Sequence, residues 1–98
     1  MRITIEFDFI QKDLLGEQQE TDVENGTTLL HLLKSVDRSI EDACSSVGEN
    51  PRPFKLLNEK GELNGCIVVI NGETPSGLLN YGLRDGDTIS LLYGYCGG

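Results

Sequence analysis

Apolar and polar residues alternate along the first nine positions of the chain. Such alternation is typical of a strand that has one face buried in a core. A connection over 10–17 and a more polar strand over 18–24 complete a predicted β-hairpin. The residues expected on the buried face of the first strand are Ile3, Ile5, Phe7 and Phe9.

The next segment changes to a helical period. A turn over 25–28 ends in two threonines, and a threonine side chain can cap the first turn of a helix. Apolar residues then recur at helical spacing, so one stripe can pack on the sheet while the charged residues between them face water. The pattern does not decide whether this helix breaks near Asp37 or continues to Val47. The expected stripe is Leu29, Leu33, Val36, Ile40, Cys44 and Val47.

The second half of the chain predicts shorter elements. A loop over 48–53 contains two prolines and precedes a short strand over 54–57. The apolar run over 66–70 fits a central strand covered on both faces. It stops at the turn dipeptide Asn71-Gly72. A wrapped loop or a single helical turn over 73–82 would then close one end of the core.

A tight turn and a last strand follow. Gly86 is expected at a positive φ within the turn over 83–87. Asp85 and Asp87 are interpreted as turn residues, because the further ligands and the closing Glu of a calcium loop are absent. Leu92 is a candidate docking contact, since the last strand predicts Ile89, Leu91 and Tyr93 on one face and Ser90 and Leu92 on the other.

Length and charge limit the class of protein. A chain of 98 residues is long enough for one domain with a modest core. No apolar stretch approaches the roughly 20 residues that span a bilayer, so we expect a cytoplasmic protein without membrane contact. The net charge is -8, from 16 acidic and 8 basic residues. This surface disfavours nucleic acid and favours a basic protein partner.

Side chains that could carry out chemistry are few and scattered. His31 lies opposite the apolar stripe of the predicted helix, without a paired nucleophile, and should be exposed. The spacing of Cys44, Cys66 and Cys96 fits no zinc site, so reduced thiols are expected, the first two of them in the core. We therefore expect no metal, no bound cofactor and no enzyme active site in this chain.

The strongest functional signal is the end of the chain, Tyr93-Gly94-Tyr95-Cys96-Gly97-Gly98. A Gly-Gly end can thread a channel too narrow for other residues, and six extended residues reach about 20 Å. The unhindered Gly98 carboxylate can attack the α-phosphate of ATP, and the resulting acyl-adenylate accepts a sulfur or amine nucleophile. We predict a folded domain over 1–93 and a flexible tail over 94–98. The residues that we expect to contact a partner are Leu92, Tyr93, Gly94, Tyr95 and Cys96.

The order of elements resembles the β-grasp fold of ubiquitin-like proteins, an α+β fold in which a mixed sheet grips one main helix. At the residue level the chain is similar to the ubiquitin-like sulfur carriers: ThiS, MoaD, the small archaeal modifier proteins and the ubiquitin-related modifier. The matching residues are the apolar strand ending in Asn71-Gly72, the turn Leu83-x-Asp85-Gly86-Asp87 and the terminal Gly97-Gly98.

The resemblance implies that an E1-like enzyme adenylates Gly98 with ATP. The carboxylate would then become a thiocarboxylate for molybdopterin, thiamin or transfer-RNA thiolation, or be joined to lysines of target proteins. The chain would be a carrier and not an enzyme. Two alternatives stay open: a small subunit dedicated to molybdopterin synthase, with the large subunit as partner, and an interaction domain with an incidental Gly-Gly end. Cys96 is either a tolerated exposed thiol or a participant in sulfur transfer.

Overall fold

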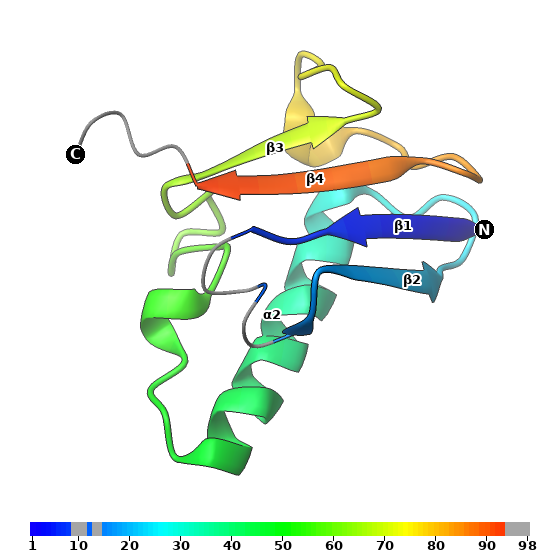
Figure 1. Cartoon of the computed structure of the whole chain (residues 1–98). Coiled ribbons are helices and arrows are strands. Elements are labelled where there is room, and N and C mark those ends of the chain that lie inside the picture. Colours follow the sequence, from blue (N-terminus) through cyan, green and yellow to red (C-terminus); the bar gives the residue numbers. More distant parts are fainter. Residues whose placement is uncertain (9–11, 13–14, 94–98) are drawn as a thin grey trace.

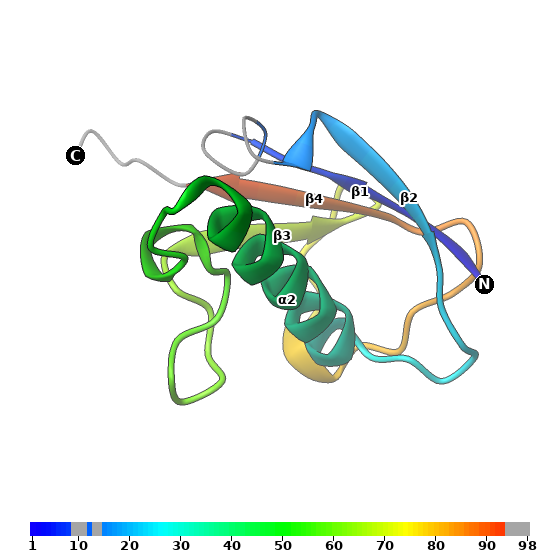
Figure 2. The same ribbon diagram turned by 90° about the horizontal axis from the view of Figure 1, so that it is seen from below.

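The computed structural model describes residues 1–8, 12 and 15–93. A four-stranded mixed sheet carries one long helix, α2, across one of its faces, which we call the inner face (Figures 1 and 2). The order of strands in the sheet is β2-β1-β4-β3. The elements are β1 (Arg2–Glu6), β2 (Gln18–Asp22), α2 (Leu29–Val47), β3 (Cys66–Ile70) and β4 (Thr88–Tyr93), with short 3-10 helices η1 (Arg52–Phe54) and η2 (Leu78–Asn80).

The first and last strands of the chain lie side by side in the middle of the sheet. β1 pairs with β4 in parallel, with Ile5 opposite Ile89. β2 and β3 flank this central pair, and each runs antiparallel to its neighbour. The predicted mixed sheet, its N-terminal hairpin and its single main helix are therefore confirmed.

The prediction that the run over 66–70 is a central strand covered on both faces is wrong. β3 is an edge strand of the sheet, and the side chain of Ile67 is 47% exposed. A run in which every residue is apolar has no alternation from which the number of covered faces can be read.

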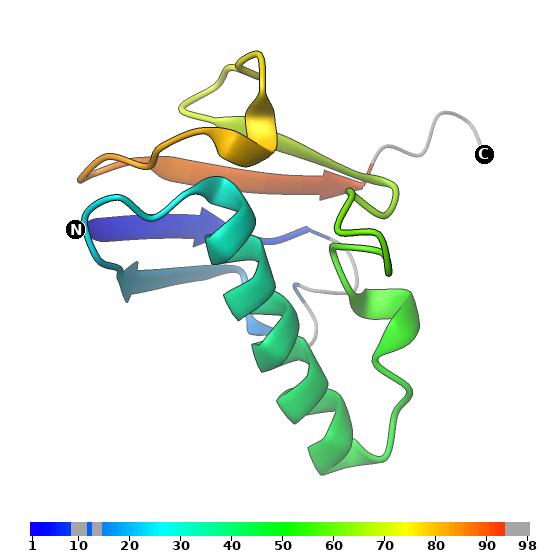
Figure 3. The same ribbon diagram turned by 180° about the vertical axis from the view of Figure 1, so that it is seen from behind.

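The core lies between α2 and the inner face of the sheet. All predicted apolar positions of α2 except the last are buried, and so are those of β1 that the structure describes. Val47 is 66% exposed, because the last turn of α2 extends beyond the sheet (Figure 3). Phe9 lies outside the described residues. The buried positions that the sequence predicted here are Ile3, Ile5, Phe7, Leu29, Leu33, Val36, Ile40 and Cys44.

The ends of α2 are set by its caps. Thr28 is the N-cap, and its side-chain oxygen accepts a hydrogen bond from the His31 N–H at 3.4 Å. The helix does not break at Asp37 but runs to Val47. Gly48 ends it with a φ of 74°, a conformation that glycine adopts without steric cost.

The segment over 73–82 closes the core at the start of α2. Leu78, Leu79 and Tyr81 pack against the buried residues, as the sequence predicts. The Leu29 N–H donates to the Tyr81 carbonyl at 2.9 Å, and the Leu83 N–H donates to the Thr27 carbonyl at 3.0 Å. These bonds tie η2 to the first turn of the helix.

The short strand predicted over 54–57 does not form. Leu57 makes only an isolated bridge with Leu63, and the segment before it contains η1. The carboxylate of Asp37 accepts hydrogen bonds from the Leu56 N–H at 2.6 Å and from the Leu57 N–H at 3.1 Å. The backbone groups that a strand would use here are bonded to a side chain of α2 instead.

Asp37 is a buried anchor that the sequence did not reveal. Its side chain lies on the buried side of α2, and the residue is 5% exposed. Burial raises the pKa of the Asp37 carboxyl, while the two N–H bonds and nearby Lys55 oppose this increase. The carboxylate fixes the segment over 50–64 against the helix, since Leu56 and Leu57 are buried on either side of these bonds.

Removing this anchor should destabilise the fold. Asp37→Ala leaves two buried N–H groups without an acceptor, so we expect the free energy of unfolding to fall by about 2–4 kcal/mol. Asp42→Ala, which removes an exposed carboxylate from the same helix, is the matched control and should change it by less than about 0.5 kcal/mol. Urea denaturation of both variants measures the difference. Equal stabilities would contradict the anchoring role.

Candidate functional site

The turn before β4 is held by side-chain hydrogen bonds to both neighbouring strands. Asp85 Oδ1 accepts from the Arg2 N–H at 2.7 Å. Asp87 is buried; its Oδ1 accepts from Asn71 Nδ2 at 2.8 Å and its Oδ2 from the Arg84 N–H at 2.9 Å. The predicted turn role of the two aspartates is confirmed, as is the positive φ of Gly86, which is 87°.

Asn71 completes this connection from the side of β3. Its Oδ1 accepts from the Thr88 N–H at 2.9 Å, and its own N–H donates to the Thr88 carbonyl at 2.9 Å. Asn71 and Gly72 have φ values of 52° and 84°, as the predicted turn requires. The two turn motifs of the sequence therefore bond to each other and fix the register of β4 against β3.

This register determines where the tail begins. β4 ends at Tyr93, directly opposite Cys66 at the start of β3. The predicted functional residues Gly94, Tyr95, Cys96, Gly97 and Gly98 lie outside the described residues, as do the side chains of Tyr93 and Cys66. The structure thus describes the sheet as far as the strand that precedes the predicted tail.

An exposed apolar pair lies at this departure point. Leu92 is 41% exposed and lies directly opposite Ile67, which is 47% exposed. Both belong to the outer face of the sheet, away from α2, because the buried Val68 and Leu91 face the helix. Val69 is half-buried on the same outer face. We call Ile67, Val69 and Leu92 the outer patch.

The outer patch brings exposed apolar side chains together on one face of the sheet. Three large hydrophobic side chains are exposed in the part of the chain that the structure describes, and two of them are this cross-strand pair. Leu92 was predicted from its position in the last strand. Ile67 was missed, because the sequence alone did not place β3 at the edge of the sheet.

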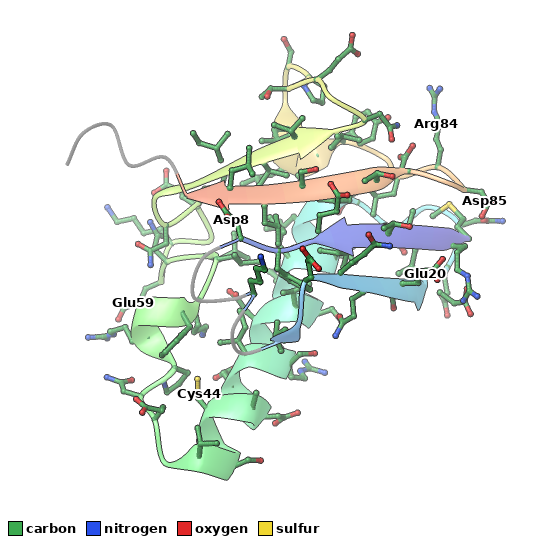
Figure 4. All side chains as sticks on the ribbon, viewed as in Figure 1. Asp8, Glu20, Cys44, Glu59, Arg84 and Asp85 are labelled. Carbon is green, nitrogen blue, oxygen red and sulfur yellow. The ribbon has the colours of Figure 1, made fainter. Side chains whose placement is uncertain are left out.

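The remainder of the outer face is polar and largely acidic. The Ser90 hydroxyl donates to Glu6 Oε1 at 2.7 Å. Arg2 is shared between Glu20 and Asp22, at 4.0 and 3.5 Å. Figure 4 shows Glu20 on β2 and Asp8 near the end of β1. A partner that covers this face needs apolar side chains opposite the outer patch and basic groups beside them.

The described side chains provide no reactive group at this face. Cys44 is 0% exposed beneath the sheet, and burial raises the pKa of its thiol, which favours the protonated form. His31 is exposed on α2, as predicted. Within the described ranges, no group of three or more His, Cys, Asp or Glu is placed to hold a metal ion, and no helix is long and apolar enough to cross a membrane.

Comparison with known proteins gives matches among solved structures only: no protein-family model and no curated protein matches the chain. SAMP1 from Haloferax volcanii has a TM-score of 0.73 and 20% sequence identity, and the match covers 100% of both chains. Urm1 from Trypanosoma brucei has a TM-score of 0.66 and 24% identity, covering 99% of this chain and 95% of that one.

A third similar structure comes from a complex, that of BexX and CysO from Amycolatopsis orientalis. It has a TM-score of 0.65 and 23% identity, and covers 98% of this chain and 99% of that one. These neighbours are ubiquitin-like sulfur-carrier proteins. The chain therefore has the β-grasp fold of that class, as the resemblance in its turn motifs implies.

The hydrogen bonds around Asp87 should be required for stability. Asp87→Ala leaves the Arg84 N–H and Asn71 Nδ2 without the buried carboxylate that accepts their part-buried hydrogen bonds, so a loss of about 2–3 kcal/mol in unfolding free energy is expected. Asp85→Ala, in the same turn, removes one exposed bond and should cost only about 0.5–1.5 kcal/mol. Urea denaturation compares them. A larger loss for Asp85→Ala would show that this connection has been misassigned.

Proposed function

We propose that this chain is a ubiquitin-like sulfur carrier or protein modifier that works through the carboxylate of Gly98. The observation that supports it most is the placement of β4. This strand is bonded on both sides in the centre of the sheet, ends beside the exposed outer patch, and leads directly into the Gly-Gly sequence. The folded domain supplies a docking surface, and the tail supplies the reacting group.

The chemistry is carried out on the chain by an E1-like enzyme. The Gly98 carboxylate oxygen attacks the α-phosphorus of ATP, pyrophosphate leaves, and an acyl-adenylate forms. A sulfur nucleophile then displaces AMP to give a thiocarboxylate, or a lysine amine of a target protein displaces AMP to give an isopeptide bond. ATP binds to the enzyme, so the chain itself needs no cofactor.

The two final glycines make the carboxylate accessible to such an enzyme. Neither has a Cβ, so the end of the tail can pass a narrow entrance. The five residues after Tyr93 span at most about 17 Å. The active site of the partner must therefore lie within that distance of the end of β4. This proposal places the protein in the cytoplasm, where ATP is available to the enzyme.

The outer patch is the proposed docking surface for the enzyme. Ile67 and Leu92 are close enough to the tail that their burial places the last residues in front of the partner's active site. A molybdopterin synthase large subunit or a conjugation target would use the same surface, because each must also receive the tail. Two other functions compete with this proposal: a small subunit dedicated to molybdopterin synthase, and an interaction domain whose Gly-Gly end is incidental.

The end of the tail should control adenylation. Gly98→Ala adds a methyl group at the reacting residue, and we expect ATP–pyrophosphate exchange with the cognate E1-like enzyme to fall at least about tenfold. An added serine after Gly98 moves the carboxylate and should abolish exchange. Both variants should unfold at the same temperature as the parent chain. Unchanged exchange for both would point to an interaction domain with an incidental Gly-Gly end.

The outer patch should control docking without affecting the chemistry. Replacing Ile67 and Leu92 together by Thr places side chains with high strand propensity in both strands but removes apolar surface, and should raise the KM of the E1-like enzyme for the carrier about tenfold or more with little change in kcat. Val47→Thr removes an even more exposed apolar side chain, at the end of α2 and away from the outer patch, and is the control. Equal KM values for the two variants would refute this docking surface.

A further inference from the structure

Positive charge is concentrated on one side of this acidic protein. The segment over 50–64 runs beside the second half of α2 (Figures 1 and 3), and two adjoining hollows lie between them. Five of the eight basic residues line these hollows, together with four of the sixteen acidic ones. The rest of the chain contains three basic and twelve acidic residues. The five basic residues are Lys34, Arg38, Arg52, Lys55 and Lys60.

The more positive of the two hollows, which we call the basic hollow, has a volume of about 430 Å³. Lys34 and Arg38 reach it from α2, and Lys55 and Lys60 from the opposite wall. Leu57 forms part of the lining. Because α2 covers the inner face of the sheet, the hollow lies on the opposite side of the molecule from the outer patch.

Both walls of the basic hollow are fixed. The Asp37 carboxylate holds the backbone of Leu56 and Leu57 against α2. Asn58 Oδ1 accepts from the Lys60 N–H at 2.8 Å and from the Glu62 N–H at 3.1 Å, which orders the turn that carries Lys60. The amide nitrogen of Asn58 donates to no residue that the structure describes and can therefore donate to a ligand.

The acidic groups around the hollow already have partners. Glu59 pairs with Arg52 at 2.9 Å, and Glu41 pairs with Lys55 at 3.8 Å. Lys34, Arg38 and Lys60 are exposed and make no ion pair with any residue that the structure describes. The lining of the basic hollow has four basic side chains against the three acidic ones of Asp37, Glu41 and Glu59, so the hollow has a small excess of positive charge and three basic side chains available to a ligand.

We propose that the basic hollow is a second docking site, which binds an acidic extended segment of a partner protein. Carboxylates of such a segment complement the three unpaired basic side chains, and its carbonyl oxygens suit the Asn58 amide. Asp37, Glu41 and Glu59 line the same hollow, so positive charge is interrupted by negative charge and does not match the continuous charge of a nucleic-acid backbone. A peptide with spaced carboxylates fits this mixed lining better.

The second site extends the proposed function, because it does not use the tail. The outer patch lies on the outer face of the sheet, and the basic hollow lies beside α2 on the other side of the molecule. A partner on the outer patch and an acidic segment in the basic hollow can therefore be bound at the same time. Binding should be weak and sensitive to salt, since exposed ion pairs supply it; raising the salt from about 20 to 300 mM should reduce affinity at least tenfold.

The test uses the full ¹⁵N-labelled chain and two synthetic peptides, one of alternating Glu and Ser and one of alternating Gln and Ser. The Glu peptide should shift amide resonances over 34–41 and 55–61, and the Gln peptide should not. Arg38→Gln with Lys60→Gln should weaken binding about tenfold. Lys12→Gln with Arg84→Gln, which removes the same charge away from the hollow, should leave it within twofold.

Three outcomes would overturn the proposal: no localised shifts, equal weakening by the two double variants, or tighter binding of inorganic pyrophosphate or oligouridylate at the same residues. The last would assign the hollow to phosphate ligands. Gly98→Ala should bind the Glu peptide like the parent chain. If the carrier function were disproved, the binding of the Glu peptide would still be expected. The two proposals can therefore be tested separately.

Discussion

The parallel pairing of β1 with β4 is the interaction on which the rest of the structure depends. It joins the two ends of the sequence in the centre of the sheet, a pairing of distant segments that carries a large loop-closure cost. Ile5 and Ile89, opposite each other, are both almost fully buried beneath this pair. A tail carried by a central strand has a fixed starting position, which a tail on a frayed edge strand would lack.

The two faces of the molecule differ in charge and polarity. The outer face combines an apolar pair with acidic side chains, whereas the two hollows beside α2 collect five of the eight basic residues. Composition alone gave a uniformly acidic protein and a basic partner. In the structure, the charges are divided between two surfaces that would recognise ligands of opposite charge. A net charge of -8 cannot indicate this division.

The sequence predicted those elements whose side chains alternate or recur with a clear period. β1, α2 and β4 each have one buried and one exposed side, so periodicity identified them and placed Leu92 on the outer face. The edge position of β3 and the exposure of Ile67 were not predictable in this way, because a wholly apolar run contains no contrast between faces.

Contacts between distant segments explain the other differences. The strand over 54–57 was expected from local composition, but its N–H groups bond to Asp37, nineteen and twenty residues earlier. In the sequence, Asp37 is interpreted only as a place where the helix could break, and the position of Leu56 and Leu57 shows why it is buried. For the candidate site, the sequence predicted Leu92 and the tail that follows it. The exposed Ile67 beside Leu92 could be identified only from the order of strands in the sheet.

The most direct test of the central claim is the intact mass of the protein purified from cells that contain its cognate E1-like enzyme, with fragmentation at the C-terminus. A sulfur carrier should have one oxygen of Gly98 replaced by sulfur, a gain of about 16 Da, and a protein modifier should have Gly98 joined to a lysine of another protein. An unmodified carboxylate in the presence of an active E1-like enzyme, or a chain that continues beyond Gly98, would contradict it.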